Sequence, residues 1–138
     1  MRLVAFLADD GPAVGLLTAA DRVVRLRAID GALDLALAED SLPVLLDEAG
    51  RVAARVFRDP TAGEPRSSLR LSPAVEFPGK IVCVGLNYAE HVKEGGRTGP
   101  GRPVLFAKFA NAVVGDGGPF VRPEGSHALD LEVELGVV

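Results

Sequence analysis

The chain has 138 residues, of which 48% are hydrophobic and 25% charged, a balance typical of a folded globular protein rather than a disordered one. Its 15 basic and 19 acidic side chains give a net charge of −4, and the absence of any Lys/Arg cluster argues against a nucleic-acid-binding surface. A single cysteine excludes an intramolecular disulfide, and no apolar run approaches the ~20 residues that span a bilayer, so we expect a soluble cytoplasmic protein that binds neither nucleic acid nor membrane.

The N-terminal residues predict a small antiparallel meander. Short apolar runs at residues 3–7, 14–17 and 23–26 are separated by turn clusters that contain Asp, Gly or Pro. Evenly spaced short runs are typical of strands joined by tight turns. A helix is also indicated near residues 30–37, without defined ends.

Residues 41–58 carry a clear helical pattern. Ser41 is expected to cap the first turn, Pro43 is tolerated there, and Asp59-Pro60 ends the helix. We expect its apolar stripe to pack on the meander, and a partner-binding helix is the alternative. The stripe recurs at steps of three and four residues: Leu42, Leu45, Leu46, Ala49, Val52, Ala53, Val56 and Phe57.

The Pro-, Gly- and Ser-bearing stretch that follows has no apolar period and is expected to be a linker. The predicted organisation is a small domain at residues 1–62, a linker at 63–72 and a second domain at 73–138.

A buried strand is predicted at residues 81–86, where the sequence is continuously apolar, and Cys83 within it is interpreted as a small hydrophobic side chain. A short helix at 87–94 follows. There His91 and Glu94 lie three residues apart and share a face. A carboxylate placed this way can orient an imidazole as a general base, and an ordinary exposed pair is the alternative.

The next segment combines a glycine-rich loop with a second strand. The loop at residues 95–103 is either a lid over a site or a plain connection. Residues 104–109 predict a strand in which Lys108 interrupts the apolar run. That lysine either meets an anionic substrate group or extends to water.

Residues 130–135 alternate strictly between acidic and apolar side chains. In a strand, Asp130, Glu132 and Glu134 would point to one face, roughly 7 Å apart. Carboxylates at this spacing can hold one hard cation. A strand whose acidic face is exposed to water is the alternative.

Three strings are more specific than these patterns: Lys80–His91 (KIVCVGLNYAEH), Pro103–Lys108 (PVLFAK) and Asp130–Leu135 (DLEVEL). In this order and spacing they resemble the fumarylacetoacetate hydrolase family, over roughly residues 70–138. The N-terminal part looks like the small domain of bacterial members. The resemblance implies an α+β fold, mainly β, in which the meander-plus-helix domain precedes the first part of a β-roll.

The resemblance also implies a chemistry. Glu132 and Glu134 become ligands of Mg²⁺ (or Mn²⁺ or Ca²⁺), and the ion would stabilise an enolate of a 1,3-dicarbonyl or 2-oxo-acid substrate. His91 and Glu94 become the pair that activates water, and Lys108 a substrate-binding residue. Hydrolytic members cleave a C–C bond, and this is the leading interpretation. A homodimer is also implied.

Two alternatives remain open. One is an isomerase or decarboxylase of the 2-hydroxyhepta-2,4-diene-1,7-dioate type, from aromatic catabolism. The other is a non-catalytic binding or assembly module whose acidic segment only faces water. Phe109 stands where many relatives have Pro, so the pocket wall is expected to differ. The resemblance places a third carboxylate ligand beyond Val138, so we expect a piece of a longer protein or a shortened relative.

Overall fold

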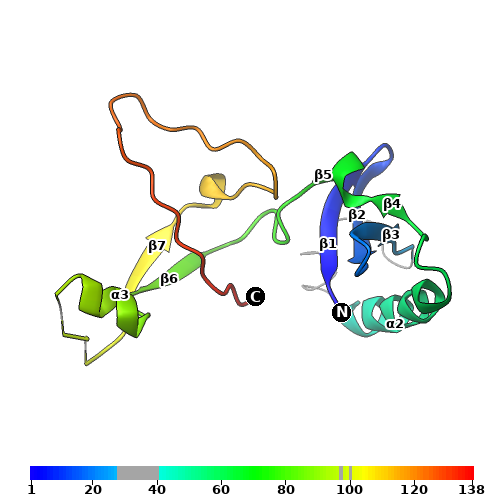
Figure 1. Cartoon of the computed structure of the whole chain (residues 1–138), viewed down its shortest axis with the longest axis horizontal. Helices are drawn as coiled ribbons and strands as arrows, with labels where there is room; N and C mark the ends of the chain where they lie inside the picture. Colours follow the sequence, from blue (N-terminus) through cyan, green and yellow to red (C-terminus); the bar gives the residue numbers. More distant parts are fainter. Residues whose placement is uncertain (28–40, 97, 100) are drawn as a thin grey trace.

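The computed structural model describes residues 1–27, 41–96, 98, 99 and 101–138, and the helix predicted near residues 30–37 lies outside them. Within these residues the fold is mixed, with more strand than helix, and contains one five-stranded and one two-stranded sheet (Figure 1). None of the described helices combines the length and apolar character needed to cross a membrane.

The N-terminal part is an antiparallel sheet with strand order β4-β3-β2-β1-β5. The predicted meander is confirmed as its first three strands. Gly11 has φ 123° and Asp21 has φ 54°, and both residue types accept the left-handed backbone that such turns require. The strands are β1 (Leu3–Ala8), β2 (Gly11–Leu17), β3 (Arg22–Arg25), β4 (Glu64–Pro65) and β5 (Arg70–Leu71).

The stretch predicted as a linker is folded into this sheet. Strand β4 extends the sheet beside β3, β5 extends it beside β1, and the 3₁₀ turn η1 (Arg66–Ser68) joins them. Pro65 is tolerated because β4 is an edge strand. Two-residue strands have no hydrophobic period, so the sequence pattern could not predict them.

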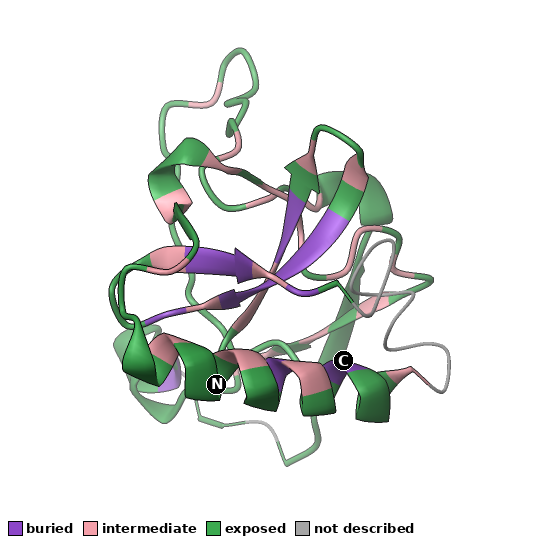
Figure 2. Ribbon diagram, turned by 90° about the vertical axis from the view of Figure 1, so that its right-hand side faces the viewer, coloured by how far each residue is buried: buried purple, intermediate pink, exposed green. Residues whose placement is uncertain are grey.

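The predicted helix is confirmed as α2 (Leu42–Arg58), and it packs on the sheet. Leu45 and Ala49 are fully buried in one core cluster with Val14 and Leu26. Figure 2 shows the buried residues gathered in the strands and on the side of α2 that faces them. The packing interpretation of the apolar stripe is therefore confirmed for Leu45 and Ala49, with Val52 partly buried beside them.

Two details of α2 differ from expectation. The Ser41 side chain makes no capping hydrogen bond; instead its backbone carbonyl accepts one from the Leu45 amide at 3.0 Å. Four members of the predicted stripe are exposed, so the expected burial is wrong for them: Leu42, Leu46, Ala53 and Phe57.

The C-terminal part is built on an antiparallel hairpin of β6 (Ile81–Gly85) and β7 (Val104–Lys108). Both strands are confirmed, but their predicted burial is not. Cys83 is half-buried, and apolar side chains of both strands are exposed. A two-stranded sheet alone cannot cover its own faces. The hairpin connection carries α3 (Ala89–Glu94), and the 3₁₀ turn η2 (Ala110–Ala112) follows β7.

Candidate functional site

Helix α3 is the element that positions the predicted His–Glu pair. It starts just beyond the end of β6, after Leu86, which has φ 55°. Bulky residues rarely adopt this conformation, so the chain turns sharply here. The helix ends at Gly95, and Val92 is its buried residue. A six-residue helix has little stability of its own, so burial of Val92 fixes its position.

His91 and Glu94 lie on one face of α3, as predicted from their spacing. Both side chains are exposed to solvent. On a different side of the helix, the Lys93 ammonium donates a hydrogen bond to Glu90 Oε1 at 3.0 Å. This leaves the imidazole and the carboxylate of the predicted pair on an open surface, where water and a small molecule can reach them.

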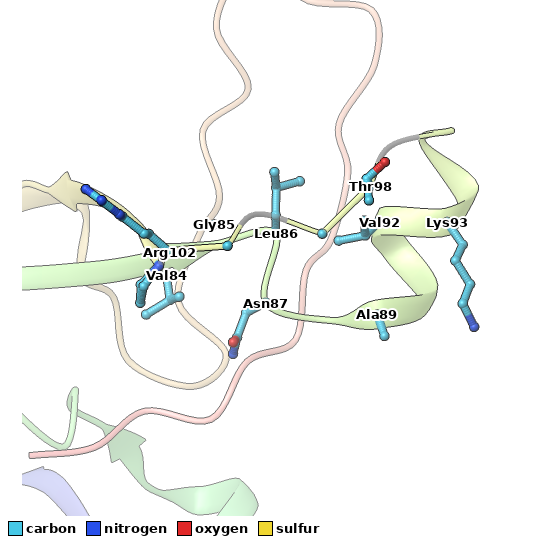
Figure 3. A pocket seen from close by; sticks show the side chains of 12 residues that line it. Val84, Gly85, Leu86, Asn87, Ala89, Val92, Lys93, Thr98 and Arg102 are labelled. Carbon is cyan, nitrogen blue, oxygen red and sulfur yellow. The ribbon is translucent and has the colours of Figure 1, made fainter.

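A hollow of about 600 Å³ lies beside the other side of α3. Val92 from α3, Leu86 from the preceding turn and Thr98 from the following loop line part of it (Figure 3). Neither His91 nor Glu94 is among the described residues that line it. Figure 3 shows the Arg102 and Lys93 side chains at opposite ends of the hollow, pointing away from one another. Its charges therefore do not converge on one ligand group.

The residues that line this hollow carry no signal in the sequence that predicts it. Its polar side chains are Asn87, Lys93, Thr98 and Arg102, and no spacing rule connects them because they come from separate segments of the chain. The predicted lid function of that loop stays a prediction.

Lys108 is the last residue of β7 and pairs with Ile81 in the hairpin register. Phe106 lies on the same face two residues earlier, and both side chains are exposed. Lys108 therefore extends to water here, at the end of the hairpin opposite to α3. Its role toward a substrate stays a prediction.

The acidic segment differs from expectation. Residues 130–138 belong to no helix or strand and are exposed throughout, including the apolar side chains of Leu131, Val133 and Leu135. The predicted strand at 130–135 is therefore absent. Alternation favours a strand only where another strand supplies hydrogen-bond partners, and β6 and β7 pair only with each other within the described residues.

The predicted metal ligands are consequently not gathered into a centre. Among the described residues, no group of three or more His, Cys, Asp or Glu side chains is placed to hold a metal ion. Glu132 and Glu134 therefore form no such group with His91 or Glu94. The structure places His91 and Glu94 on the same short helix, and it does not bring the acidic segment to them.

The sequence profile described as "Fumarylacetoacetate (FAA) hydrolase C-terminal" matches residues 80–138, the part that carries β6, α3, β7 and the acidic segment. Residues 80–138 are therefore similar to the fumarylacetoacetate hydrolase family. The resemblance inferred from the three sequence strings is thereby confirmed.

Family relatives extend the similarity over the whole chain. It is 37% identical to the protein named oxaloacetate tautomerase FAHD2A, mitochondrial, of Homo sapiens, over 145 aligned residues covering 100% of this chain and 44% of that relative. Oxaloacetate tautomerase fahd2, mitochondrial, of Xenopus laevis is 32% identical with the same two coverages. A Dictyostelium discoideum fumarylacetoacetate hydrolase domain-containing protein 2 homolog is 42% identical over 54% of this chain and 24% of its own length. The chain thus spans less than half the length of these relatives.

Proposed function

We propose that this chain serves an enzyme that acts on a 2-oxo acid through its enol or enolate form, with keto–enol tautomerisation of oxaloacetate as the leading reaction. The observation that carries this proposal is the 37% identity, over all of the chain, to relatives named oxaloacetate tautomerase. Tautomerisation moves one proton from a carbon beside the carbonyl group to the carbonyl oxygen. It needs a group that accepts and returns a proton, and no water enters the product.

His91 is the residue proposed to move that proton. Histidine is the side chain most often used as a general acid or base, and Glu94 lies on the same face of α3 as His91. A carboxylate that accepts a hydrogen bond from an imidazole holds the ring in one tautomer. The two residues act as one unit, because the carboxylate orients the base that performs the transfer.

Cleavage of a C–C bond by water is the second candidate. The specific observation in its favour is that both members of the His91–Glu94 pair are exposed, which suits activation of a water molecule. The substrate would then be a 1,3-dicarbonyl compound of the acylpyruvate type. The two reactions differ in whether the imidazole removes a proton from substrate carbon or from water.

A divalent cation is part of the proposal as a partner of Glu132 and Glu134. Carboxylate oxygens are the donors that Mg²⁺ prefers, and a bound cation would stabilise negative charge on an enolate oxygen. In the described structure these two residues form no group of three ligands, so we assign no step to the ion. Metal dependence, a homodimer and a cytoplasmic location stay predictions.

The test is the rate at which enol-oxaloacetate converts to the keto form, followed by loss of enol absorbance with the complete product of the gene. We expect acceleration over the buffer rate, and a decrease in kcat of about 10²- to 10⁴-fold in His91→Ala, typical of a lost general base. Glu90→Gln, on another side of the same helix, is the matched control and should keep the parent rate. Absence of acceleration would refute the tautomerase proposal. Equal rates for His91→Ala and the parent protein would refute the role of His91 in it.

A parallel assay decides between the two reactions. Acylpyruvate is incubated with the same protein, and release of the carboxylic acid product is measured. Hydrolysis without enol–keto conversion would make the second candidate the correct one.

A further inference from the structure

We propose that Arg66 closes an ionic clasp, which holds the loop at residues 113–118 against the N-terminal sheet and so fixes where β7 lies relative to that sheet. The proposal concerns the arrangement of the chain and does not depend on which reaction the protein catalyses.

Arg66 makes three polar contacts, which connect it to two other segments that are distant in the sequence. Its backbone amide donates to the Asp21 carbonyl oxygen at 3.0 Å, and its Nε donates to Asp21 Oδ1 at 2.8 Å. Its Nη1 donates to Asp116 Oδ2 at 2.7 Å. Asp21, at the β2–β3 turn, raises the pKa of the Arg66 guanidinium, with a smaller contribution from Asp116. The planar guanidinium thus bridges two carboxylates at once, which an ammonium group cannot do with the same geometry.

A close backbone contact lies next to this bridge. Gly115 approaches the end of β5 so tightly that a Cβ atom there would collide with the carbonyl group of Leu71. The loop is closed on itself by a hydrogen bond from the Gly118 amide to the Gly115 carbonyl at 2.9 Å. Figure 1 shows this yellow-to-orange loop beside the green chain that leaves β5. Gly115 permits the close backbone contact with Leu71, and the adjacent Asp116 supplies the carboxylate that pairs with Arg66.

The path of the chain explains how the clasp affects the position of the C-terminal part. The chain leaves the N-terminal sheet at Leu71, runs through β6, α3 and β7, and returns to that sheet at Gly115. The return point is only a few residues beyond Lys108, with η2 between them. The part of the chain that carries the His91–Glu94 pair therefore contacts the N-terminal sheet at both of its ends. If the Arg66–Asp116 ion pair breaks, only the covalent connection after Leu71 remains.

Ionic strength should control this clasp. The side chains of Arg66, Asp21 and Asp116 are 38%, 61% and 67% exposed, so mobile ions can reach them. Such pairs are screened when the Debye length falls to about 3 Å in ~1 M salt. The clasp should therefore hold the loop in dilute buffer and release it at high salt.

Hydrogen–deuterium exchange of residues 113–118 tests the proposal. We expect exchange in this loop to be on the order of two- to five-fold faster in Asp116→Asn than in the parent chain, as for loss of one exposed ion pair. Salt at ~1 M should accelerate the parent loop by a similar factor and the variant loop little further. Asp47→Asn is the matched control, because it breaks the exposed Asp47–Arg51 pair within α2 and should leave the loop unchanged.

Two further variants and the exchange of the sheet amides distinguish loss of the ion pair from other causes of faster exchange. Gly115→Ala should release the loop by steric collision, and Asp116→Glu should restore protection that Asp116→Asn loses. Amides of β1 and β2 report whether the N-terminal sheet remains folded; if a variant unfolds it, the salt series on the unmodified chain decides. Unchanged loop exchange in both Asp116→Asn and high salt would overturn the ionic clasp, as would release by Gly115→Ala alone.

Discussion

Replacing Leu45 by alanine should show how far the N-terminal scaffold depends on the contact between α2 and the sheet. The Leu45 side chain has 0% exposure and lies in the cluster with Val14, Leu26 and Ala49. The substitution removes three buried carbons, which corresponds to about 2.4 kcal/mol at ~0.8 kcal/mol per group. The cavity that remains raises the expected loss of unfolding free energy to about 2.5–4 kcal/mol.

Urea unfolding followed by circular dichroism measures this loss. With a slope of roughly 2 kcal/mol per molar urea, the midpoint should fall by about 1–2 M. Leu46→Ala is the matched control, since Leu46 is the next residue of the helix and is 44% exposed; its cost should be about 1 kcal/mol or less. Equal losses for the two variants would refute the view that α2 buries this particular face.

Two further predictions concern the same sheet. The hydrogen bond from Arg25 to Asp10 holds the pKa of that carboxyl below its usual value, so the pair contributes stability above a pH of about 4 that is lost as the pH falls through the lowered pKa. Asp10→Asn should therefore lower the melting temperature near neutral pH and leave it equal to that of the parent protein in strong acid; an equal difference at both pH values would contradict this cause. Gly63 has φ 87° and no room for a Cβ beside the Val23 carbonyl, so Gly63→Ala should cost about 1–3 kcal/mol in chemical denaturation. Gly79→Ala, with nothing within 4 Å of the added Cβ, should stay within about 0.5 kcal/mol, and similar losses for both would contradict the steric argument.

Elements that depend on local pattern were predicted well from the sequence. The helix at Leu42–Arg58 and the hairpin strands follow from hydrophobic period and run length. The strands Glu64–Pro65 and Arg70–Leu71 were not predicted, because each exists only by pairing with a strand distant in sequence. The tight docking of Gly115 on Leu71 was missed for the same reason, since it depends on tertiary structure alone.

The same distinction between local pattern and tertiary contact applies to the candidate site. His91 and Glu94 share a face because they are three positions apart in a helix, a local property that spacing encodes. The placement of Glu132 and Glu134 depends on a partner strand that the described residues do not supply, so alternation alone could not establish it. Arg66 and Asp116 are 50 residues apart, and nothing in their neighbourhoods marks them as a pair.

The proposed function predicts that a divalent cation bound by Glu132 and Glu134 lies close to His91 in the working protein, although the described residues do not gather these side chains. Mn²⁺-induced broadening of the His91 ring signal, measured by NMR on the complete product of the gene, tests it most directly. The signal is assigned as the one that His91→Ala removes. We expect Mn²⁺ to broaden it in the parent protein and to leave it sharp when Glu132 and Glu134 are both replaced by alanine. A signal that stays sharp in the parent protein, or broadens equally in both proteins, would contradict the account.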